Sequence, residues 1–375
     1  MTIAHSEPTR RYTYLIADLS SGDIRDEAQF SSVKFSAELN KPGGFNGTIS
    51  IEPTNVEHIT DIATPNRVTL ANFTPGRTIV WVLRNSTPVW GGIIWGFQAR
   101  LDSRVVDFAA QDFISYYSRR TINMTLTYDA ATHDQFTIAE GLIDYAQLVA
   151  GGDIGTTVYY NALSGRKRDR TYWYFERKNI YEALQQLADV DDGFDFAQDV
   201  SGSQAGGLSH QLTLSYPYRG RVTDLVFDSS KNVRLLNWNQ DGLRMANLIA
   251  AQGAGEGDEM TQATAADPGK LATYPLLEDV TMHKDVAVQQ TIIDHAAQDL
   301  RRQANPVEGV EVEIDPDDDT SGLGSFIVGD VVRVKVDDGF INIDKQMRVM
   351  GYTVQVNENG RETMNVRLAS WEGSI

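Results

Sequence analysis

The feature of this chain that most restricts its fold is a strand pattern that occurs twice, near the two ends of the sequence. IIWGFQARL at Ile93–Leu101 and RVMGYTVQV at Arg348–Val356 each place apolar residues before a glycine, an aromatic residue and an alternating strand. Upstream of each, a glycine opens another strand, at Gly76 and at Gly329. Alternation of apolar and polar residues beside turn residues predicts β-hairpins. We therefore expect two similar β units.

The first third of the chain reads as β throughout. Short stretches rich in β-branched and aromatic residues are separated by turn residues such as NKPGG and TPG. This spacing is typical of a barrel or a sandwich. DFISYYSRR at Asp112–Arg120 predicts one short helical turn that closes the unit. The first expected domain is therefore a β-barrel at residues 1–128.

Helical patterns appear in the middle of the chain. Thr137 and Glu140 have the spacing of a capping box, and the helix that they open is expected to stop at the glycines of 151–152. A second helix is expected to begin near Asn179 and to be followed by a hairpin. Residues 129–232 are therefore expected to form an α+β insertion domain.

The third expected domain, residues 233–375, combines a helix-containing region with a second β-barrel. GAGEGDEMTQATAADPGK at 253–270 reads as a loop of small residues, and a helix is expected over roughly 284–304. One face of this helix is expected to carry Val286, Ile293, Ala297 and Leu300. The fold class predicted for the whole chain is mainly β, with an α+β insertion between two similar barrels.

Charge and composition exclude several classes of function. The 375 residues include 33 basic and 51 acidic residues, which gives a net charge of −18 and argues against a dedicated nucleic-acid binder. The lack of cysteine excludes disulfides, thiolate zinc sites and cysteine nucleophiles. The first residues show no signal-peptide pattern, and no apolar stretch is long enough to span a membrane. We expect a protein made in a cytoplasm.

Catalytic and metal-binding motifs are not evident. The six histidines match no zinc-binding motif, so scattered single histidines are favoured over a metal site assembled in space. Gly253–Asp258 has closely spaced glycines but fits neither of the phosphate-binding patterns. No nucleophile motif and no pair of carboxylates marks a cleft. We expect no enzyme, no cofactor and no metal.

An acidic turn follows the strand EGVEVEID near the C-terminus. Its carboxylates belong to Asp315, Asp317, Asp318 and Asp319. A helix-loop-helix calcium site is excluded, because Thr320 stands where glycine is required and Phe326 where glutamate is required. A solvated turn is the favoured interpretation. Weak cation binding and an acidic collar on a DNA passage are the alternatives.

One segment, GRKRDRTYWYFERK at Gly165–Lys178, interleaves basic and aromatic residues. Such clusters bind single-stranded nucleic acid in some proteins and anchor protein interfaces in others. A charged loop that leads into a strand is the commoner interpretation. The contact surface for another protein and the single-strand site stay open as alternatives.

The repeated hairpin is explained if the chain forms a trimer. Two similar β units per chain would then give six similar units in a ring, which can dock on a six-fold partner. A chance resemblance between two hairpins is the alternative. On the repeat hypothesis, Gly96 and Gly351 hold matching positions in superposable barrels, and Phe97 and Tyr352 lie in equivalent environments.

The order of motifs along most of the chain resembles the tail hub, or baseplate hub, proteins of tailed bacteriophages, including minor tail proteins of actinobacterial siphophages. The resemblance rests on TPVWGGIIWGF, NIYEALQQLADVDDGFDF and MANLIAAQGAGEG, followed by FIVGDVVRVKV and MRVMGYTVQVNENGRETMNVRL. It implies that Gly329 and Asp330 open one strand of the terminal barrel. It also implies that Arg348 and Val349 open another.

The resemblance implies a structural virion protein at the tail tip, assembled in the host cytoplasm. It implies a homotrimer whose two barrels per chain form a pseudo-six-fold ring. The expected partners are the hexameric distal tail protein ring, the tape measure protein and other tail-tip or receptor-binding proteins. The ring would line or close the DNA channel, and the acidic turn Asp315–Asp319 is expected partly on a lumen that DNA passes without specific binding.

Two other functions stay open. One is a tail-associated glycan or peptidoglycan hydrolase whose carboxylates the sequence does not reveal. The other is the hub of a contractile injection machine. Many members of the resembled family carry a C-terminal extension with hydrolase or receptor-binding modules, whereas this sequence stops just after the expected barrel at LASWEGSI. Host-wall digestion and receptor binding are therefore expected from separate proteins.

Overall fold

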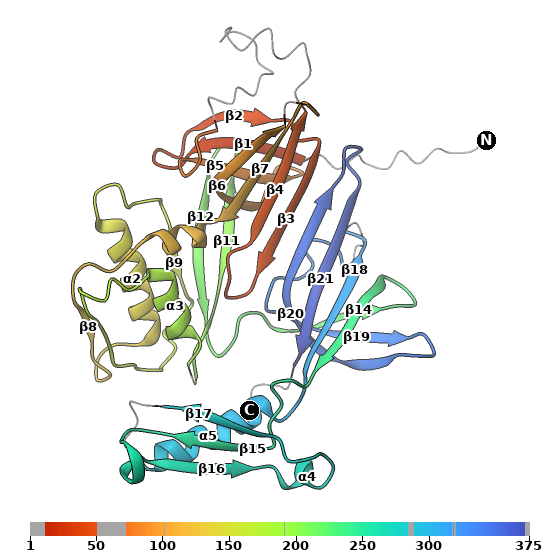
Figure 1. Cartoon of the computed structure of the whole chain (residues 1–375). Coiled ribbons are helices and arrows are strands. Elements are labelled where there is room, and N and C mark those ends of the chain that lie inside the picture. Colours follow the sequence, from red (N-terminus) through yellow and green to blue (C-terminus); the bar gives the residue numbers. More distant parts are fainter. Residues whose placement is uncertain are drawn as a thin grey trace. The chain divides into compact units, whose positions relative to one another are not determined.

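The computed structural model (Figure 1) describes residues 12–50, 73–100, 102–190, 192–283, 289–316, 318 and 320–371. The chain divides into two compact units, Met1–Arg234 with Val312–Ile375, and Leu235–Glu311. The predicted third domain, 233–375, falls in both units, and its strand Asn342–Val356 pairs with Ser32–Glu38 from the first third of the chain.

The first unit is built on one large sheet. Its N-terminal strands are β1 (Tyr12–Asp18), β2 (Ile24–Ala28), β3 (Ser32–Glu38), β4 (Gly44–Ser50), β5 (Thr78–Arg84), β6 (Thr87–Arg100) and β7 (Val105–Asp112). Its later strands are β13 (Val222–Asp228), β19 (Val331–Asp337), β20 (Asn342–Val356) and β21 (Glu362–Ser370). Two further strands, β14 (Val233–Asp241) and β18 (Val307–Ile314), run across the boundaries between the units.

The side-chain pattern of each strand reflects its burial. In β5, TIVWVLR, six of the seven residues are buried, as expected of a strand covered on both faces. In β19 the valines after Val331 alternate with exposed Arg333 and Lys335, as expected of a strand with one solvent-facing side. Leu15 of β1 and Trp81 of β5 belong to one core cluster, together with Phe113.

The two predicted β units share one sheet. The strand path is β21-β20-β3-β4-β7-β6-β5-β1-β2, and β20 pairs antiparallel with β3 from Gly351 opposite Glu38 to Val356 opposite Val33 (Figure 1). The prediction of a mainly β fold with an α+β insertion is confirmed. The N-terminal and C-terminal β units are therefore joined by direct strand pairing.

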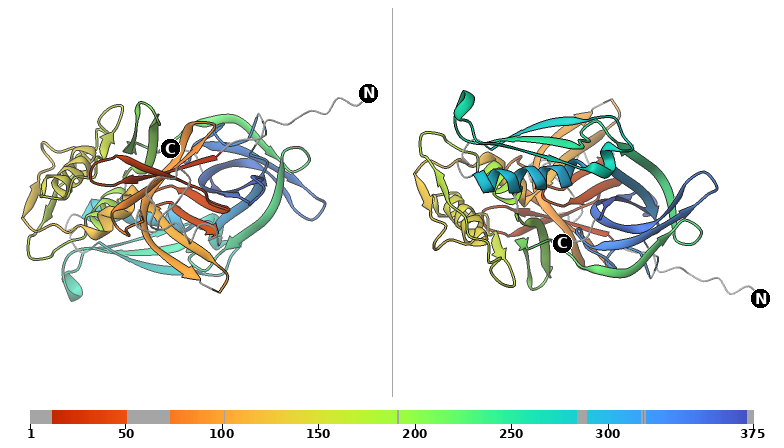
Figure 2. Two further views of the ribbon diagram at one scale, coloured as in Figure 1. Left: turned by 90° about the horizontal axis from the view of Figure 1, so that it is seen from above. Right: turned by 90° about the horizontal axis from the view of Figure 1, so that it is seen from below.

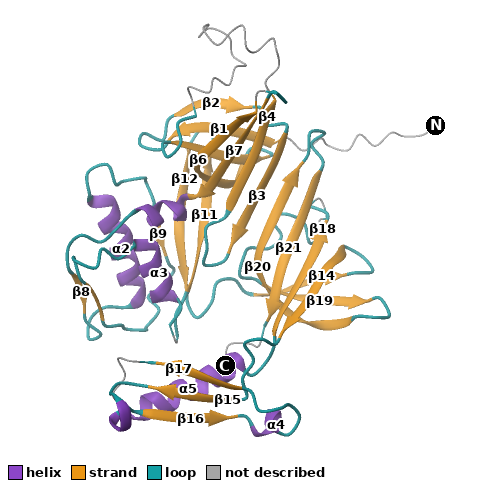
Figure 3. Ribbon diagram, in the orientation of Figure 1, coloured by secondary structure: helices purple, strands orange, loops and turns teal. Residues whose placement is uncertain are grey.

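The insertion lies between β7 and β13. It contains a 3-10 helix (Phe113–Arg119), β8 (Leu126–Tyr128), α2 (Gln135–Leu148), β9 (Thr157–Tyr159), β10 (Arg170–Tyr172), α3 (Ile180–Ala188), β11 (Asp195–Ser203) and β12 (Gly207–Ser215). The two helices pack together (Figure 3), and Leu142 and Leu184 are among their buried contacts. The core cluster of the insertion also includes Ile114 of the 3-10 helix, and the predicted bounds 129–232 stay a prediction.

The helix starts follow local capping chemistry. Asn179 caps α3, and its side chain accepts a hydrogen bond from the Glu182 backbone N–H at 3.2 Å, as predicted. The capping box predicted at Thr137 is wrong, since α2 begins at Gln135. Asp134 is the cap: its carboxylate accepts from the Phe136 backbone N–H at 2.9 Å and from the Ser164 hydroxyl.

The second unit contains a small sheet and a helix. Its elements are β15 (Leu248–Gln252), a 3-10 helix (Gly257–Glu259), β16 (Gln262–Ala266), α4 (Pro268–Leu271), β17 (Glu278–Met282) and α5 (Gln289–Gln303). The sheet order is β16-β15-β17, and α5 runs along one face of it (Figure 2). The prediction of a loop at 253–270 is wrong in part, because Gln262–Ala266 forms the strand β16, which pairs with β15.

The apolar face predicted for the second unit's long helix is also corrected. Ile292 and Ala296 are the buried residues of α5 and pack against Ala251, whereas Ile293 is 44% exposed. The helix is therefore rotated relative to the prediction, and the predicted Val286 lies outside the described residues. None of the described helices is long and apolar enough to cross a membrane.

Candidate functional site

The two repeated hairpins form three-stranded antiparallel meanders, β5-β6-β7 and β19-β20-β21. The central strands are long, with 14 residues in β6 and 15 in β20. Against the following strand, the register shifts between Ile94 and Gly96 in one meander and between Val349 and Gly351 in the other. Each glycine therefore follows a bulged residue, which agrees with the role of glycine near bulges.

The surroundings of the two repeat positions differ, so the predicted equivalence of Phe97 and Tyr352 is wrong. Phe97 is 39% exposed and its ring centroid lies 5.8 Å from that of Phe108. Tyr352 is half-buried and meets Phe326 edge-on at 6.1 Å. The reason is strand pairing: β20 has β3 on its other edge along this stretch, whereas β5 pairs with β6 only up to Ile93.

Alanine at the two repeat glycines is expected to have unequal effects. A Cβ at Gly351 would lie 2.7 Å from the Ala37 carbonyl oxygen, whereas a Cβ at Gly96 has no atom within 4 Å. Gly351→Ala should therefore lower the free energy of unfolding by about 1–3 kcal/mol, and Gly96→Ala should change it little. Denaturant unfolding of both variants measures this. Equal losses would contradict the asymmetry of the two sites.

Gly329 and Asp330 fix the entry into β19. Gly329 has a φ of 101°, and Asp330 accepts hydrogen bonds from the backbone N–H groups of Arg221 at 2.9 Å and Ile327 at 3.0 Å. Since β19 begins at Val331, this pair opens a strand as predicted. The companion prediction for Arg348 and Val349 is wrong, because both lie in the middle of β20.

Arg348 belongs to a buried ionic network between the insertion and the C-terminal meander. Its guanidinium pairs with Asp195 at the start of β11 and donates to the carbonyl oxygens of Gly329 at 3.1 Å and Arg219 at 3.0 Å. Asp195 also accepts from the Arg219 backbone N–H at 2.8 Å and the Asn40 amide at 3.0 Å. Segments far apart in sequence are therefore held by one carboxylate.

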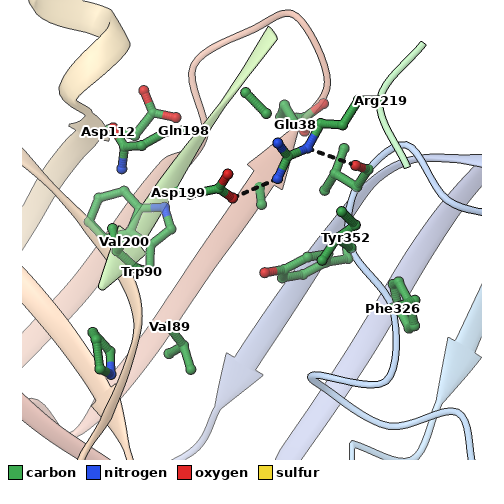
Figure 4. A pocket seen from close by; sticks show the side chains of 15 residues that line it. Glu38, Val89, Trp90, Asp112, Gln198, Asp199, Val200, Arg219, Phe326 and Tyr352 are labelled. Atoms are coloured by element: carbon green, nitrogen blue, oxygen red, sulfur yellow. Dashed lines mark hydrogen bonds and ion pairs between the residues drawn. The ribbon is translucent and has the colours of Figure 1, made fainter. Parts of the chain in front are cut away.

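A second ion pair of this region borders a small pocket (Figure 4). The Arg219 guanidinium pairs with Asp199 at 2.6 Å and donates to the Val328 carbonyl oxygen at 3.1 Å. The pocket has a volume of about 170 Å³, and its lining includes Glu38, Asp112 and Tyr352. Ligand pockets usually measure roughly 300–1,000 Å³, so this pocket is small by comparison.

Asp112, one of the carboxylates of this pocket, is buried. It accepts hydrogen bonds from the backbone N–H groups of Gly43 at 2.6 Å and Ile114 at 3.0 Å, and it caps the 3-10 helix Phe113–Arg119. Burial raises the pKa of Asp112 to about 7. The hydrogen bonds from Gly43 and Ile114 lower this pKa and so offset part of the effect of burial. The residue therefore ties β4 to β7 and to the insertion.

This raised pKa predicts a pH dependence of stability. Between pH 4 and pH 7 the folded state keeps the Asp112 proton while the unfolded state loses it, so stability falls as pH rises. From pH 5 to pH 8 the free energy of unfolding of the wild type should fall by about 2–3 kcal/mol relative to that of Asp112→Asn. Denaturant unfolding of both proteins at the two pH values measures this. A constant difference between them would contradict the raised pKa.

The acidic turn is described only at Asp315 and Asp318, and the predicted Asp317 and Asp319 lie outside the described residues. The Asp318 carboxylate accepts from the backbone N–H groups of Thr320 at 2.8 Å and Ser321 at 2.7 Å. Hydrogen bonds from Thr320 and Ser321 lower the pKa of Asp318, so it stays ionised at neutral pH. Its position on a lumen stays a prediction.

The structure also assembles a cluster that the sequence did not predict. The rings of His283, after β17, and His295, on α5, stack with centroids 4.1 Å apart, and His283 Nε2 lies 2.9 Å from an Asp299 carboxylate oxygen. Twelve positions separate the two histidines in sequence, so no local spacing marked them. Among the described residues, no group of three or more acidic residues or histidines is arranged to hold a metal.

Comparison with solved structures identifies the fold. A 43 kDa tail protein of a Shewanella oneidensis prophage matches with a TM-score of 0.64 and 12% identity, over 95% of this chain and 97% of that one. A tail protein from Neisseria meningitidis matches with a TM-score of 0.57 and 14% identity, over 95% and 96%. A prophage tail protein from Listeria monocytogenes matches with a TM-score of 0.57 and 10% identity, over 96% and 95%.

At these identities the likeness shows a shared fold. No family model and no curated protein matches the chain. The fold is thus that of phage tail proteins, as the motif order predicted.

Proposed function

We propose that this chain is a structural protein of a bacteriophage tail, and specifically the hub of the tail tip. The observation that carries the proposal is the fold, which matches three tail proteins, two of them described as prophage proteins, over at least 95% of this chain and of theirs. A fold alone does not set function, so the proposal also rests on the arrangement of the repeats.

The duplicated meander supports a ring. Each chain carries two meanders with a bulge before the repeat glycine, and both belong to one sheet. Three chains would present six such meanders, and a six-fold distal tail ring could dock on them. In this account the tape measure protein and other tail-tip or receptor-binding proteins are the remaining neighbours.

The charge supports a passage for DNA through the ring. The chain carries a net charge of −18, and an acidic lumen repels the DNA backbone and so prevents adhesion. In the proposal, part of the acidic excess, including the turn Asp315–Asp319, lines this lumen. The ring lines or closes the channel until the genome leaves.

The proposed role is non-enzymatic. The pocket bordered by Arg219 is small, and the Asp112 carboxylate in it is held by backbone donors from two elements. These features suit a structural junction better than the carboxylate pair of a glycan hydrolase. Purified chain incubated with peptidoglycan should therefore release no soluble fragments. Release that Asp112→Asn abolishes would favour the hydrolase.

Labelling of virions tests the location. Antibodies raised against the purified chain, detected with gold, should mark one end of the tail in particles released by the cells that encode it. Antibodies against the capsid protein serve as the positive control for accessibility, and mild detergent exposes covered tips. Particles that carry label along the tube, or particles that contain no chain by immunoblot, would contradict the proposal.

A further inference from the structure

An aromatic turn projects from the insertion. It consists of Trp173, Tyr174 and Phe175, which directly follow β10 and are 47%, 56% and 64% exposed. The rings of Trp173 and Phe175 stack with centroids 6.0 Å apart and planes at 15°, and Tyr174 meets Phe175 edge-on at 5.5 Å. Three neighbouring aromatic side chains thus form one exposed apolar surface.

Backbone and side-chain hydrogen bonds hold this surface in place. The Glu176 N–H donates to the Trp173 carbonyl oxygen at 3.1 Å, and the Tyr174 N–H donates to the Thr125 hydroxyl oxygen at 3.4 Å. Downstream, the Asn179 amide donates to the Ser118 carbonyl oxygen at 2.6 Å. Ordered aromatic side chains lose little entropy on binding, and exposed apolar clusters mark interaction surfaces.

The charge around the aromatic turn selects the partner. Gly165–Lys178 contains six basic and two acidic residues, a net charge of +4, so the rest of the chain carries −22. Arg166 and Lys178 form ion pairs with Asp192 and Glu182, and Lys167 and Arg177 are exposed basic residues of the segment. A partner surface that combines exposed acidic residues with an apolar side chain would complement it. Such a surface exists on this chain itself.

The complementary surface is the tip of the hairpin between β19 and β20. We call Asp337, Asp338, Gly339 and Phe340 the acidic tip. Phe340 is 91% exposed, and the Asp338 carboxylate accepts from the backbone N–H groups of Phe340 at 3.0 Å and Ile341 at 2.7 Å. Hydrogen bonds from Ile341 and Phe340 lower the pKa of Asp338, so the turn holds a negative charge beside a projecting aromatic ring.

We infer that the acidic tip of one copy docks on the aromatic turn of a second copy. Phe340 would pack on the rings of Trp173 and Phe175, with Asp337 facing the basic residues of Gly165–Lys178. Each copy offers both surfaces, so the contact is heterologous, and a heterologous contact gives a ring where the rotation between neighbouring copies closes. The inference takes the closed arrangement of three copies from the proposed function. The inference deepens the proposed function, on which it rests, by naming a contact between neighbours in the ring.

Light scattering after size exclusion tests the contact. The wild-type chain should have the mass of three chains, and raising the salt concentration should weaken the assembly, because its charges are exposed. Phe340→Ala, and separately the double variant Trp173→Ala/Phe175→Ala, should each raise the dissociation constant at least about 30-fold, which equals about 2 kcal/mol. All three positions are exposed, so folding should persist, as circular dichroism checks.

A matched control and a mixing experiment sharpen the result. Leu243 is 90% exposed in the second unit, and Leu243→Ala should keep the wild-type mass. In a mixture of the two variants, the Phe340→Ala protein keeps its aromatic turn and the double variant keeps its acidic tip. The one intact contact is therefore between the acidic tip of the double variant and the aromatic turn of Phe340→Ala. The mixture should therefore form complexes of two chains and no ring.

Two results would overturn the inference. One is a Phe340→Ala protein that assembles as the wild type does at every concentration tested. The other is a wild-type chain that is monomeric throughout. Neither result concerns the location of the chain in the virion, which the gold labelling decides separately. Failure of the copy-to-copy contact is thus distinguishable from failure of the proposed tail function.

Discussion

Replacement of Arg348 by alanine is expected to lower the free energy of unfolding by about 3–5 kcal/mol, because it leaves the Asp195 carboxylate in the interior without its cation. The side chains of Arg348 and Asp195 are only 14% and 10% exposed. The arginine also donates to the carbonyl oxygens of Gly329 and Arg219, which lose a donor in the variant.

Arg333→Ala is the matched control. It removes an arginine from an ion pair of good geometry, 2.6 Å from Asp344, but both side chains are largely exposed at 56% and 41%. Solvent screens such pairs, so the stability should change little. Denaturant unfolding of the two variants gives the comparison. Similar losses from Arg348→Ala and Arg333→Ala would show that the buried network contributes no more than a surface pair.

Gly329→Ala is expected to cost about 3 kcal/mol of stability, for two reasons that add. Gly329 has a φ of 101°, a conformation that strains a residue with a side chain. A Cβ there would also lie 2.6 Å from the Arg219 carbonyl oxygen, and backbone atoms cannot move aside cheaply. The Arg348 guanidinium donates hydrogen bonds to the carbonyl oxygens of Gly329 and Arg219, so the clash would disturb the ionic network as well.

Gly360→Ala separates the two causes. Gly360 has a φ of 73° but no atom within 4 Å of an added Cβ. This variant should therefore show the conformational strain alone, about 1 kcal/mol. The difference between the two variants in denaturant unfolding measures the clash. A Gly329→Ala protein as stable as Gly360→Ala would contradict the close approach of Gly329 and Arg219.

Local sequence patterns predicted part of the local structure, although the capping box at Thr137 was wrong because Asp134 caps α2. The cap at Asn179 and the strand that follows Asp330 were predicted because their signals lie within a few residues of one another. The bulges before Gly96 and Gly351 lie in the hairpins that the repeated pattern predicted. Periodicity, capping and turn residues are short-range properties, so one sequence suffices to see them.

Contacts between residues far apart in the sequence were not predicted. The pairing of β3 with β20 brings Glu38 opposite Gly351, and the pair of Asp195 with Arg348 spans 153 positions. No periodicity encodes which strands become neighbours. The different surroundings of Phe97 and Tyr352 follow directly from that pairing. The face of α5 was missed for a related reason, since Ile292 and Ile293 differ only in which one meets the sheet.

The most direct test of the central claim is a cryo-electron microscopy reconstruction of the tail tip, computed without imposed symmetry. The account predicts density for three copies of this chain, with their six meanders, β5-β6-β7 and β19-β20-β21, arranged around one channel beneath a six-fold ring. A tip whose density does not accommodate the chain, or accommodates it in any arrangement other than a three-fold ring, would contradict the account.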